Sequence, residues 1–441
     1  MKLRSDHIVF LTLFLVACTK SSNEKEQILH NNKQQQDTIK VDTGTVLHQK
    51  DSVPLKKNIS RTEQALLLSN KKYLKTAEKE FIKEALSQFS ALPATVHAPL
   101  DNPQTEEKIH LGKLLFFDPI LSGDKDVSCA TCHHPSSGYA EFVEVSIGVN
   151  GHGLGSKRAF NHPNDIPLVK RNSQTVLNTA FNGITTNQSR TPEVSPMFWD
   201  LRASSLEEQA LKPIESLEEM RGRNYTEKQI IPEVVQRVQN IPDYQKLFAK
   251  AFEGDASVSA KKISQAIAAF ERTLITNNTR FDQYMRGDKQ ALSQSELEGF
   301  NQFISAGCGT CHNGPMFSDF KPHTLGVKDN NKLTYSDKGL DDAYAFRTPS
   351  LRNLQYTAPY MHNGTKKTLK QVLEFYEDIT FGKVENKLVK KEALDPLLKV
   401  VDIPVKDMSL IISFLNTLNS TGFDKEVPQS VPSGLPVGGN I

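Results

Sequence analysis

The chain has 441 residues, of which 38% are hydrophobic and 24% are charged, and its formal net charge is +2. This composition is typical of a soluble globular protein, and the length allows two or three domains. No long run of basic residues occurs, so the sequence argues against a nucleic-acid partner.

The N-terminus has the features of a bacterial export signal. It begins with Lys2 and Arg4, continues with an apolar run over residues 8–17 that is too short to span a bilayer, and reaches Cys18 in the sequence LVAC. This sequence resembles a lipobox, and an ordinary signal peptide with a chance cysteine is the alternative. We expect a lipoprotein signal peptide over residues 1–18, a lipid anchor at Cys18 and a periplasmic mature protein.

The rest of the chain divides by composition and motif. Residues 19–60 are polar and predict a disordered tether, and apolar residues at helical spacing predict an N-terminal helical extension over residues 61–100. Two blocks follow, residues 101–280 and 281–421, and each contains one C-x-x-C-H motif, which suggests the duplication of a small domain. Residues 422–441 are rich in Pro, Gly and Ser and predict a loose tail.

Helical patterns dominate both blocks. Ser205 and Ser293 each precede a glutamate by three residues, as in a capping box, and Thr368 opens a further helix. Residues 259–275 are amphipathic, and residues 407–418 form a final apolar segment. Because strand-like alternation is scarce, we predict a mainly α protein with long loops.

The five cysteines of the chain do not suggest a disulfide framework, because four of them form two widely separated C-x-x-C pairs. Each pair is followed directly by a histidine, in CATCH at residues 129–133 and CGTCH at residues 308–312. C-x-x-C-H attaches c-type haem: two thiols one turn apart bond to the haem vinyl groups, and the histidine binds the iron. The motifs predict two covalent haems held by Cys129, Cys132, Cys308 and Cys311, with His133 and His312 as proximal ligands. A redox pair or half of a zinc site would leave both histidines unexplained.

Beyond these motifs, the sequence resembles the bacterial diheme cytochrome c peroxidase family, including its MauG-like branch. The resemblance covers residues 109–418 and rests on LGKLLFFDP (111–119), RNSQTVLN (171–178), FWDLR (198–202), LEEQA (206–210), FRTPSLRN (346–353) and TAPYMHNG (357–364). It implies two c-type cytochrome domains: a peroxidatic haem domain over residues 101–280 and an electron-transfer haem domain over residues 281–421. It also implies a calcium ion at their interface.

The resemblance locates the far-side ligand of the C-terminal haem. Peroxidases of this family usually place a methionine fourteen residues after the histidine of P-Y-x-H-x-G, and counting from His362 gives Tyr376. A tyrosine here resembles the MauG-like branch. A phenolate stabilises ferric iron and lowers the reduction potential, so that the two haems can share oxidising equivalents. Packing of Tyr376 in the helix core, with Met361 as the iron ligand, is the alternative.

The N-terminal haem differs from that of many relatives. They carry a distal histidine sixteen residues after the proximal ligand, whereas here SIG at residues 146–148 is followed by Val149. We therefore expect an open iron at rest and an enzyme that needs no reductive activation. His152 could replace the missing ligand through a loop shift, and the alternative is that His152 is simply solvated.

The resemblance also implies catalytic and calcium-binding residues. Glu219 is expected to move the peroxide proton, Gln209 to be its polar companion, and Trp199 to relay electrons between the haems. Glu218 is the alternative to Glu219 if the match is shifted by one residue. The alternatives without a catalytic role are a solvated glutamate and an ordinary core tryptophan. The expected calcium ligands are the side chain of Asn172, for which a turn residue is the alternative, and the carbonyl groups of Thr357 and Pro359, completed by water.

The predicted function is that of a cytochrome c peroxidase. It would reduce hydrogen peroxide with electrons from a small periplasmic cytochrome c or cupredoxin, passed from the C-terminal to the N-terminal haem. A MauG-like oxidase that acts through high-valent iron on a protein or organic substrate is one alternative, which Tyr376 favours. A non-catalytic diheme electron carrier is another. The oligomeric state stays open, with a homodimer as one option.

Overall fold

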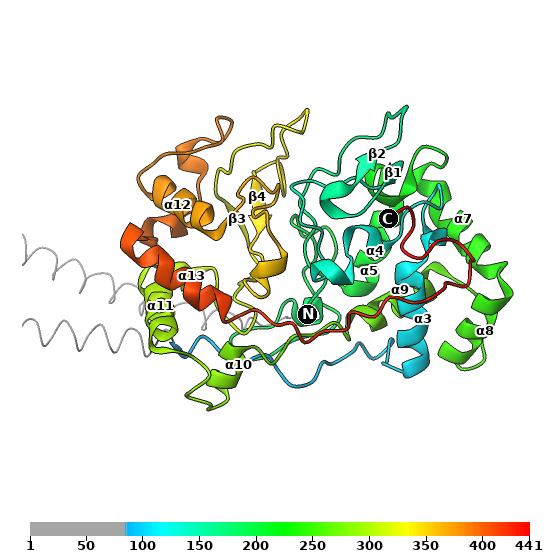
Figure 1. Ribbon diagram of the computed structural model, residues 1–441, viewed down its shortest axis with the longest axis horizontal. Helices are drawn as coiled ribbons and strands as arrows, with labels where there is room; N and C mark the ends of the chain where they lie inside the picture. Colours follow the sequence, from blue (N-terminus) through cyan, green and yellow to red (C-terminus); the bar gives the residue numbers. More distant parts are fainter. Residues whose placement is uncertain (1–83, 85) are drawn as a thin grey trace, which may run out of the picture. The chain divides into compact units, whose positions relative to one another are not determined.

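The computed structural model describes residue 84 and residues 86–441 (Figure 1). The predicted signal peptide, the tether and most of the predicted N-terminal extension lie outside the described residues. Within the described part, helices dominate and the only strands are short, so the prediction of a mainly α fold is confirmed. Residues 87–100, however, are irregular and not helical. Pro93 and Pro99 disfavour a helix there, because proline has no N–H and fixes φ.

The N-terminal half contains the helices α3 (Glu106–Phe117), α4 (Cys129–Cys132), α5 (Leu206–Gln209), α6 (Lys212–Glu215), α7 (Glu227–Gln239), α8 (Pro242–Ala251) and α9 (Ala260–Glu271). The C-terminal half contains α10 (Arg280–Met285), α11 (Gln294–Ser305), α12 (Leu369–Thr380) and α13 (Met408–Asn416). The strands β1 (Gly151–His152) and β2 (Ala159–Phe160) pair antiparallel, as do β3 (Pro322–Thr324) and β4 (Ala345–Arg347).

The two halves repeat one helix crossing. Helix α3 crosses α9 at Gly112, where a Cβ atom would lie 1.8 Å from the carbonyl oxygen of Ala266. Helix α11 crosses α13 at Gly299, where a Cβ atom would lie 2.0 Å from the carbonyl oxygen of Leu410. In both crossings, the next residue that such a Cβ atom would meet is a phenylalanine, which stands four residues after the first one in the crossed helix. Since both crossing helices α3 and α11 precede a C-x-x-C-H motif, this repeat supports the predicted duplication.

Each half has its own hydrophobic core. The first core is built mainly from α3, α7, α8 and α9, and the second from α10, α11 and α13. The second core also contains Phe89, whose ring centroid lies 5.2 Å from those of Phe300 and Phe317. We propose that the domain boundary lies near residue 280, because the first core includes Leu274 and the second begins again at Phe281.

The prediction that residues 422–441 form a loose tail is wrong. The tail runs from α13 back to the N-terminal half (Figure 1). There the backbone N–H of Gly438 donates to the carbonyl of Phe117 at 2.8 Å, and the hydroxyl of Thr131 donates to the carbonyl of Gly438 at 2.8 Å. Val431 is buried in the first core. Proline and glycine here shape turns whose polar backbone groups find partners distant in sequence, which local composition does not reveal.

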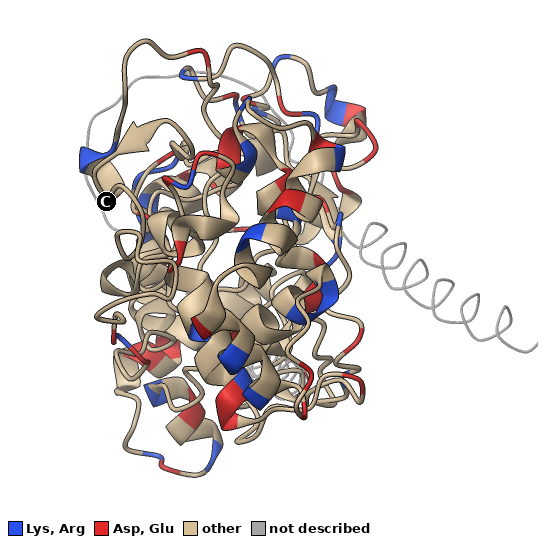
Figure 2. Ribbon diagram, turned by 90° about the vertical axis from the view of Figure 1, so that its right-hand side faces the viewer, with Lys and Arg blue, Asp and Glu red and all other residues tan. Residues whose placement is uncertain are grey.

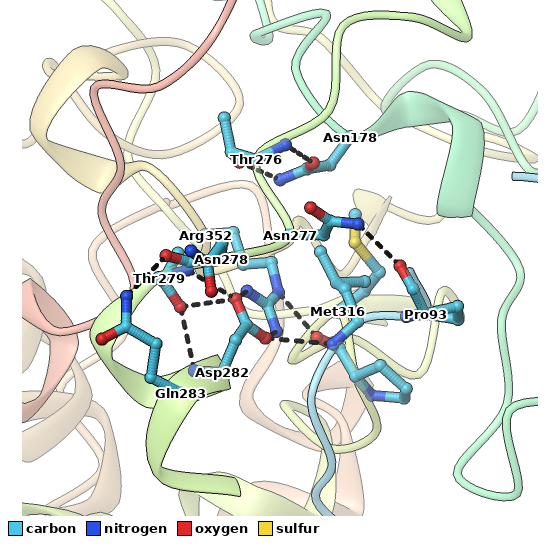
Figure 3. Close-up of polar contacts among 12 residues, drawn as sticks. Pro93, Asn178, Thr276, Asn277, Asn278, Thr279, Asp282, Gln283, Met316 and Arg352 are labelled. Carbon is cyan, nitrogen blue, oxygen red and sulfur yellow. Dashed lines mark hydrogen bonds and ion pairs between the residues drawn. The ribbon is translucent and has the colours of Figure 1, made fainter. Parts of the chain in front are cut away.

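A buried ion pair joins the start of the C-terminal half to the segment that follows β4. Asp282 accepts two hydrogen bonds of 2.9 Å from Arg352, and both side chains are almost fully buried. Figure 3 shows Asp282 joined also to Thr279, whose hydroxyl donates at 2.6 Å. Arg352 donates in addition to the carbonyl of Pro315 at 2.7 Å, and Asp282 accepts from the N–H of Leu92 at 3.0 Å.

Replacing Arg352 by Met is expected to destabilise the protein by about 3–5 kcal/mol, because it leaves the Asp282 carboxylate buried without its partner. Urea unfolding of the holoprotein, followed by circular dichroism, measures the change. Lys246→Met is the matched control, since Lys246 pairs with Asp243 at the exposed surface, and it is expected to cost less than about 1 kcal/mol. Equal changes in the free energy of unfolding for the two variants would show that the buried pair stabilises the protein no more than the exposed pair does.

Charges of both signs are interspersed along the ribbon in the view of Figure 2, and no segment of one sign dominates that view. In the described part of the chain, we find no helix with the length and apolar character needed to cross a membrane.

Candidate active site

A cavity of about 840 Å³ extends along both C-x-x-C-H motifs. From the motifs, its lining includes Cys129, Cys132 and His133 of the first and Cys308, Cys311 and His312 of the second. Side chains from both halves complete the lining, among them Gln209, Glu219, Trp199 and Tyr376. The structure therefore brings the residues predicted for haem attachment, catalysis and electron relay to one continuous space.

The two motifs have the local geometry that haem attachment needs. In each, the backbone N–H of the histidine donates to the carbonyl of the first cysteine at 3.0 Å, so the two thiols lie one turn apart. The turn is the short helix α4 in the first motif and a 3-10 turn, Cys308–Thr310, in the second. The four described cysteines form no disulfide. Both motifs thus fit a covalently attached haem.

Both histidines are held in the same orientation. Nδ1 of His133 lies 3.1 Å from the carbonyl oxygen of Tyr139, and Nδ1 of His312 lies 2.9 Å from that of Phe317. Because a carbonyl oxygen only accepts, Nδ1 carries the proton and Nε2 keeps its lone pair for a metal. Burial lowers the pKa of both imidazoles, which favours the neutral form that binds iron.

The carboxyl group of Glu219 lies on the side of the cavity that carries the first motif. Glu219 belongs to a π-helical turn, Leu217–Arg221, and burial raises its pKa. Burial raises the pKa of the Cys132 thiol, and the charge of Glu141 and then that of Glu219 add to this effect, so Glu219 lies on the side of the first motif. Gln209, at the end of α5, and Glu218 line the same cavity. A carboxyl group with a raised pKa in a cavity is suited to proton transfer.

The structure does not bring His152 to this site. His152 is exposed on β1, where its Nδ1 lies 2.8 Å from Oδ1 of Asn161, and it is not part of the cavity lining. Val149 is buried, and its N–H donates to the carbonyl of Glu219 at 3.1 Å. At the sequence position where the resemblance led us to look for a distal histidine, the chain carries this buried valine, whose backbone adjoins that of the candidate base.

Tyr376 lies on the side of the second motif. It projects from α12 into the cavity, and burial, followed by the charges of Cys311 and Cys308, raises the pKa of its hydroxyl. This hydroxyl makes no hydrogen bond to any described residue. The side chain is only partly buried and lines the cavity, so its hydroxyl is free to bind a metal held there. Met361 also lines the cavity, so position alone does not exclude it as the ligand.

Trp199 lies between the two halves. Its side chain is almost buried, and its Nε1–H donates to the carbonyl of Asn172 at 3.0 Å. Its own carbonyl accepts from the backbone N–H of Arg347, in β4, at 2.7 Å. The indole is thus fixed by the N-terminal half and its backbone by the C-terminal half, while it lines the cavity that both motifs share.

The residues predicted for calcium come from two segments that touch. The backbone N–H of Asn172 donates to the carbonyl of His362 at 2.7 Å, which joins it to the loop of residues 357–364. The side-chain amide of Asn172 donates to Val143. Among the described hydrogen bonds, none is accepted by Oδ1 of Asn172 or by the carbonyls of Thr357 and Pro359. These are hard oxygen donors of the type that calcium prefers.

Sequence reasoning missed the charged residues around Glu219. Arg202 and Asp200 stand in the motif FWDLR, and Arg171 opens RNSQTVLN, so the signal was present in segments already singled out. Arg171 pairs with Asp337, 166 positions away, and such a partner could not be inferred from spacing.

Comparison with known proteins agrees with this site. Residues 106–290 match the family of di-haem cytochrome c peroxidases. Methylamine utilization protein MauG of Methylorubrum extorquens is 34% identical over 342 residues, which cover 76% of this chain and 85% of that protein. Cytochrome c551 peroxidase of Pseudomonas aeruginosa is 35% identical over 312 residues, which cover 68% and 80%.

Solved structures show the same fold. A MauG-like protein associated with microbial copper homeostasis superposes with a TM-score of 0.59 at 28% identity, covering 75% of this chain and 95% of that one. The diheme peroxidase BthA of Burkholderia thailandensis gives a TM-score of 0.56 at 20% identity, covering 78% and 93%.

These findings support a diheme peroxidase or oxidase, and the family implies two c-type haems, in agreement with the two motifs. Since relatives above 30% identity align over more than two thirds of both chains, the protein belongs to the di-haem cytochrome c peroxidase family, which also includes MauG.

Proposed function

We propose that the protein is a periplasmic diheme cytochrome c peroxidase that reduces hydrogen peroxide to water. The observation that carries this proposal is the asymmetry of the cavity. A partly buried carboxyl group, Glu219, lies near the first motif, whereas a tyrosine hydroxyl, Tyr376, lies near the second. Export through the predicted signal peptide and a lipid anchor at Cys18 would place the enzyme at a membrane surface.

The haem groups, when bound, supply an iron that binds peroxide and two sites that store electrons. The four motif cysteines would attach the haems, and His133, His312 and Tyr376 would bind the irons. The chain itself then contributes proton handling, orientation and shielding from water.

Glu219 is assigned the role of proton carrier. Hydrogen peroxide takes up two electrons and two protons and gives two waters. A carboxylate oxygen of Glu219 accepts the proton of one peroxide oxygen and returns it to the other, so that water leaves when the O–O bond breaks. The amide of Gln209 would donate a hydrogen bond to the peroxide and hold it beside the carboxylate.

Trp199 is assigned the electron relay. Its ring is held by hydrogen bonds of its N–H and carbonyl groups to both halves of the molecule. Electrons would arrive one at a time from a small periplasmic cytochrome c or cupredoxin. A rigid, easily oxidised ring between the two motifs suits this transfer.

A MauG-like oxidase is the second candidate, and Tyr376 favours it. Mixing the holoprotein with peroxide and a reduced small cytochrome separates the two. Rapid and repeated oxidation of the cytochrome supports the peroxidase, and slow turnover with a long-lived oxidised protein supports the oxidase. A protein that does not react with peroxide at all would refute both and leave an electron carrier.

We propose that Asn172, Thr357 and Pro359 bind a calcium ion. Because these oxygens join the segment before Trp199 to a loop of the C-terminal half, removal of calcium with EGTA is expected to abolish most peroxide turnover. Calcium is expected to restore it, whereas magnesium, which demands a tighter octahedral shell, is not. Steady-state assays before and after chelation measure this effect. Unchanged turnover in protein shown by elemental analysis to be free of calcium would contradict the proposal.

A further inference from the structure

A chain of ion pairs leads from the candidate base into the C-terminal half. Oε1 of Glu219 lies 3.9 Å from Nη2 of Arg202, whose Nη1 lies 2.8 Å from Oδ1 of Asp200. Oδ2 of Asp200 lies 2.5 Å from Nη1 of Arg171, and Arg171 binds Asp337 through two hydrogen bonds of 2.5 and 2.9 Å. The charges alternate, and the side chains become more buried along the chain, from 37% exposed at Arg202 to 5% at Asp337.

The guanidinium of Arg202 is fixed from two sides. It lies over the ring of Phe198, 3.6 Å from the ring centroid, while Asp200 pairs with its Nη1 atom at 2.8 Å. A planar guanidinium held by a ring and a carboxylate has little freedom left. At 3.9 Å, Arg202 acts on Glu219 as a nearby charge and not through a hydrogen bond, so the carboxylate oxygens stay available for a proton.

The far end of the chain is anchored in the C-terminal half. Arg171 lies over the ring of Phe346, at 5.6 Å, and this ring stacks on the buried imidazole of His362, with centroids 3.6 Å apart. Phe346 belongs to β4, which also binds the backbone of Trp199. The position of Arg202 therefore depends on contacts that only the assembled halves provide.

The electrical environment of Glu219 has few components. Burial is the largest and raises its pKa; Arg202 is the largest opposing charge, Glu218 raises the pKa, and Arg171 and the hydroxyl of Ser216 lower it. Arg221 belongs to the same π-helical turn, and Lys212 and Glu215 of the adjoining helix α6 pair with each other. The charged residues of α7 are Glu227, Lys228, Glu233 and Arg237, of which the last two pair with each other. No other cation makes an ion pair with Glu219 among the described residues.

We propose that Arg202 is a positioning residue that keeps the Glu219 carboxylate ionised and oriented towards bound peroxide, and that the chain through Asp200, Arg171 and Asp337 holds Arg202 in place. This inference rests on the proposed function, because it gives Glu219 the role of base. It adds that the reactivity of the N-terminal haem pocket depends on a charge contact made by the C-terminal half.

The test compares Arg202→Met, which removes the charge, with Arg202→Lys, which keeps it. Stopped-flow mixing of the holoprotein with peroxide gives the rate constant as a function of pH. The rate constant should rise with pH where Glu219 ionises. For Arg202→Met, we expect this rise to move up by about one pH unit, since the lost cation favoured the charged form of Glu219. At a pH below this rise, the rate constant of Arg202→Met should be about tenfold lower than that of the native protein. At a pH above it, the two rate constants should be similar. Arg202→Lys keeps the charge and is expected to show little of this shift.

Arg223→Met is the matched control, because Arg223 pairs with Asp165 at the exposed surface, and it should leave the profile unchanged. Haem content and circular dichroism confirm that each variant is folded. A uniform fall in rate at every pH, with the rise unmoved, would reduce Arg202 to a structural role and overturn the proposal. If Glu219→Gln left the rate unchanged, the proposed function itself would fail. If Glu219→Gln were inactive but Arg202→Met kept the normal profile, only this inference would fail.

Discussion

Glu219→Gln is expected to lower the rate constant for peroxide reduction by about 10²–10⁴-fold, the usual contribution of a positioned acid–base group. Glutamine has nearly the same shape and keeps a polar group in the cavity, but it cannot accept and return a proton. Haem content and the binding of a small iron ligand such as cyanide should stay close to normal. Stopped-flow kinetics with peroxide in excess measures the change.

Glu218→Gln is the matched control for this prediction. Glu218 lines the same cavity one residue away, and the two glutamates differ in that Glu219 makes the described ion pair with Arg202. The rate constant of Glu218→Gln should stay within about threefold of the native value, in keeping with a group that does not transfer the proton. If instead Glu218→Gln were inactive and Glu219→Gln active, the assignment would have to move by one residue.

Tyr376→Met is expected to raise the reduction potential of the C-terminal haem on the order of hundreds of millivolts, because axial ligands tune haem potentials over a range of about 0.8 V. An anionic phenolate stabilises ferric iron, whereas a thioether favours ferrous iron. Spectroelectrochemical titration resolves the two haems and should show a much smaller change at the N-terminal one. The variant is also expected to resemble the family's peroxidases with a methionine at this position more closely in its reaction with peroxide.

Met361→Leu separates the two candidate ligands. Met361 lines the cavity together with Tyr376, so both side chains face the same space. If Tyr376 binds the iron, Met361→Leu leaves the potential and the low-spin resonance spectrum nearly unchanged. A shift in Met361→Leu together with a native spectrum in Tyr376→Phe would transfer the ligand role to the methionine.

Local patterns predicted the helices well. The capping box at Ser293 begins α11, and Thr368 caps α12. The amphipathic segment 259–275 contains α9, and the apolar segment 407–418 contains α13. These features depend on residues within one or two turns of each other, so the sequence specifies them directly.

Long-range contacts account for what the sequence left hidden. Phe89 reaches a core formed by residues more than 190 positions later, and Gly438 pairs with Phe117. In the site, the motifs identify His133, but its orientation depends on the carbonyl of Tyr139 in a following turn. The ion pair between Arg171 and Asp337 likewise joins the two halves. The spacing of residues does not reveal such partners, because each charged side chain could pair with many others in the folded chain.

The asymmetry of the two haem environments is tested most directly by electron paramagnetic resonance of the resting ferric holoprotein. Because Val149 cannot bind the iron of the N-terminal haem, we expect that iron to be high-spin. Because Tyr376 is expected to bind the iron of the C-terminal haem, that iron should be low-spin, and the two signals should be equal in amount. Two low-spin irons, or haem bound at only one of the two motifs, would contradict the assignment of an open N-terminal haem beside Glu219.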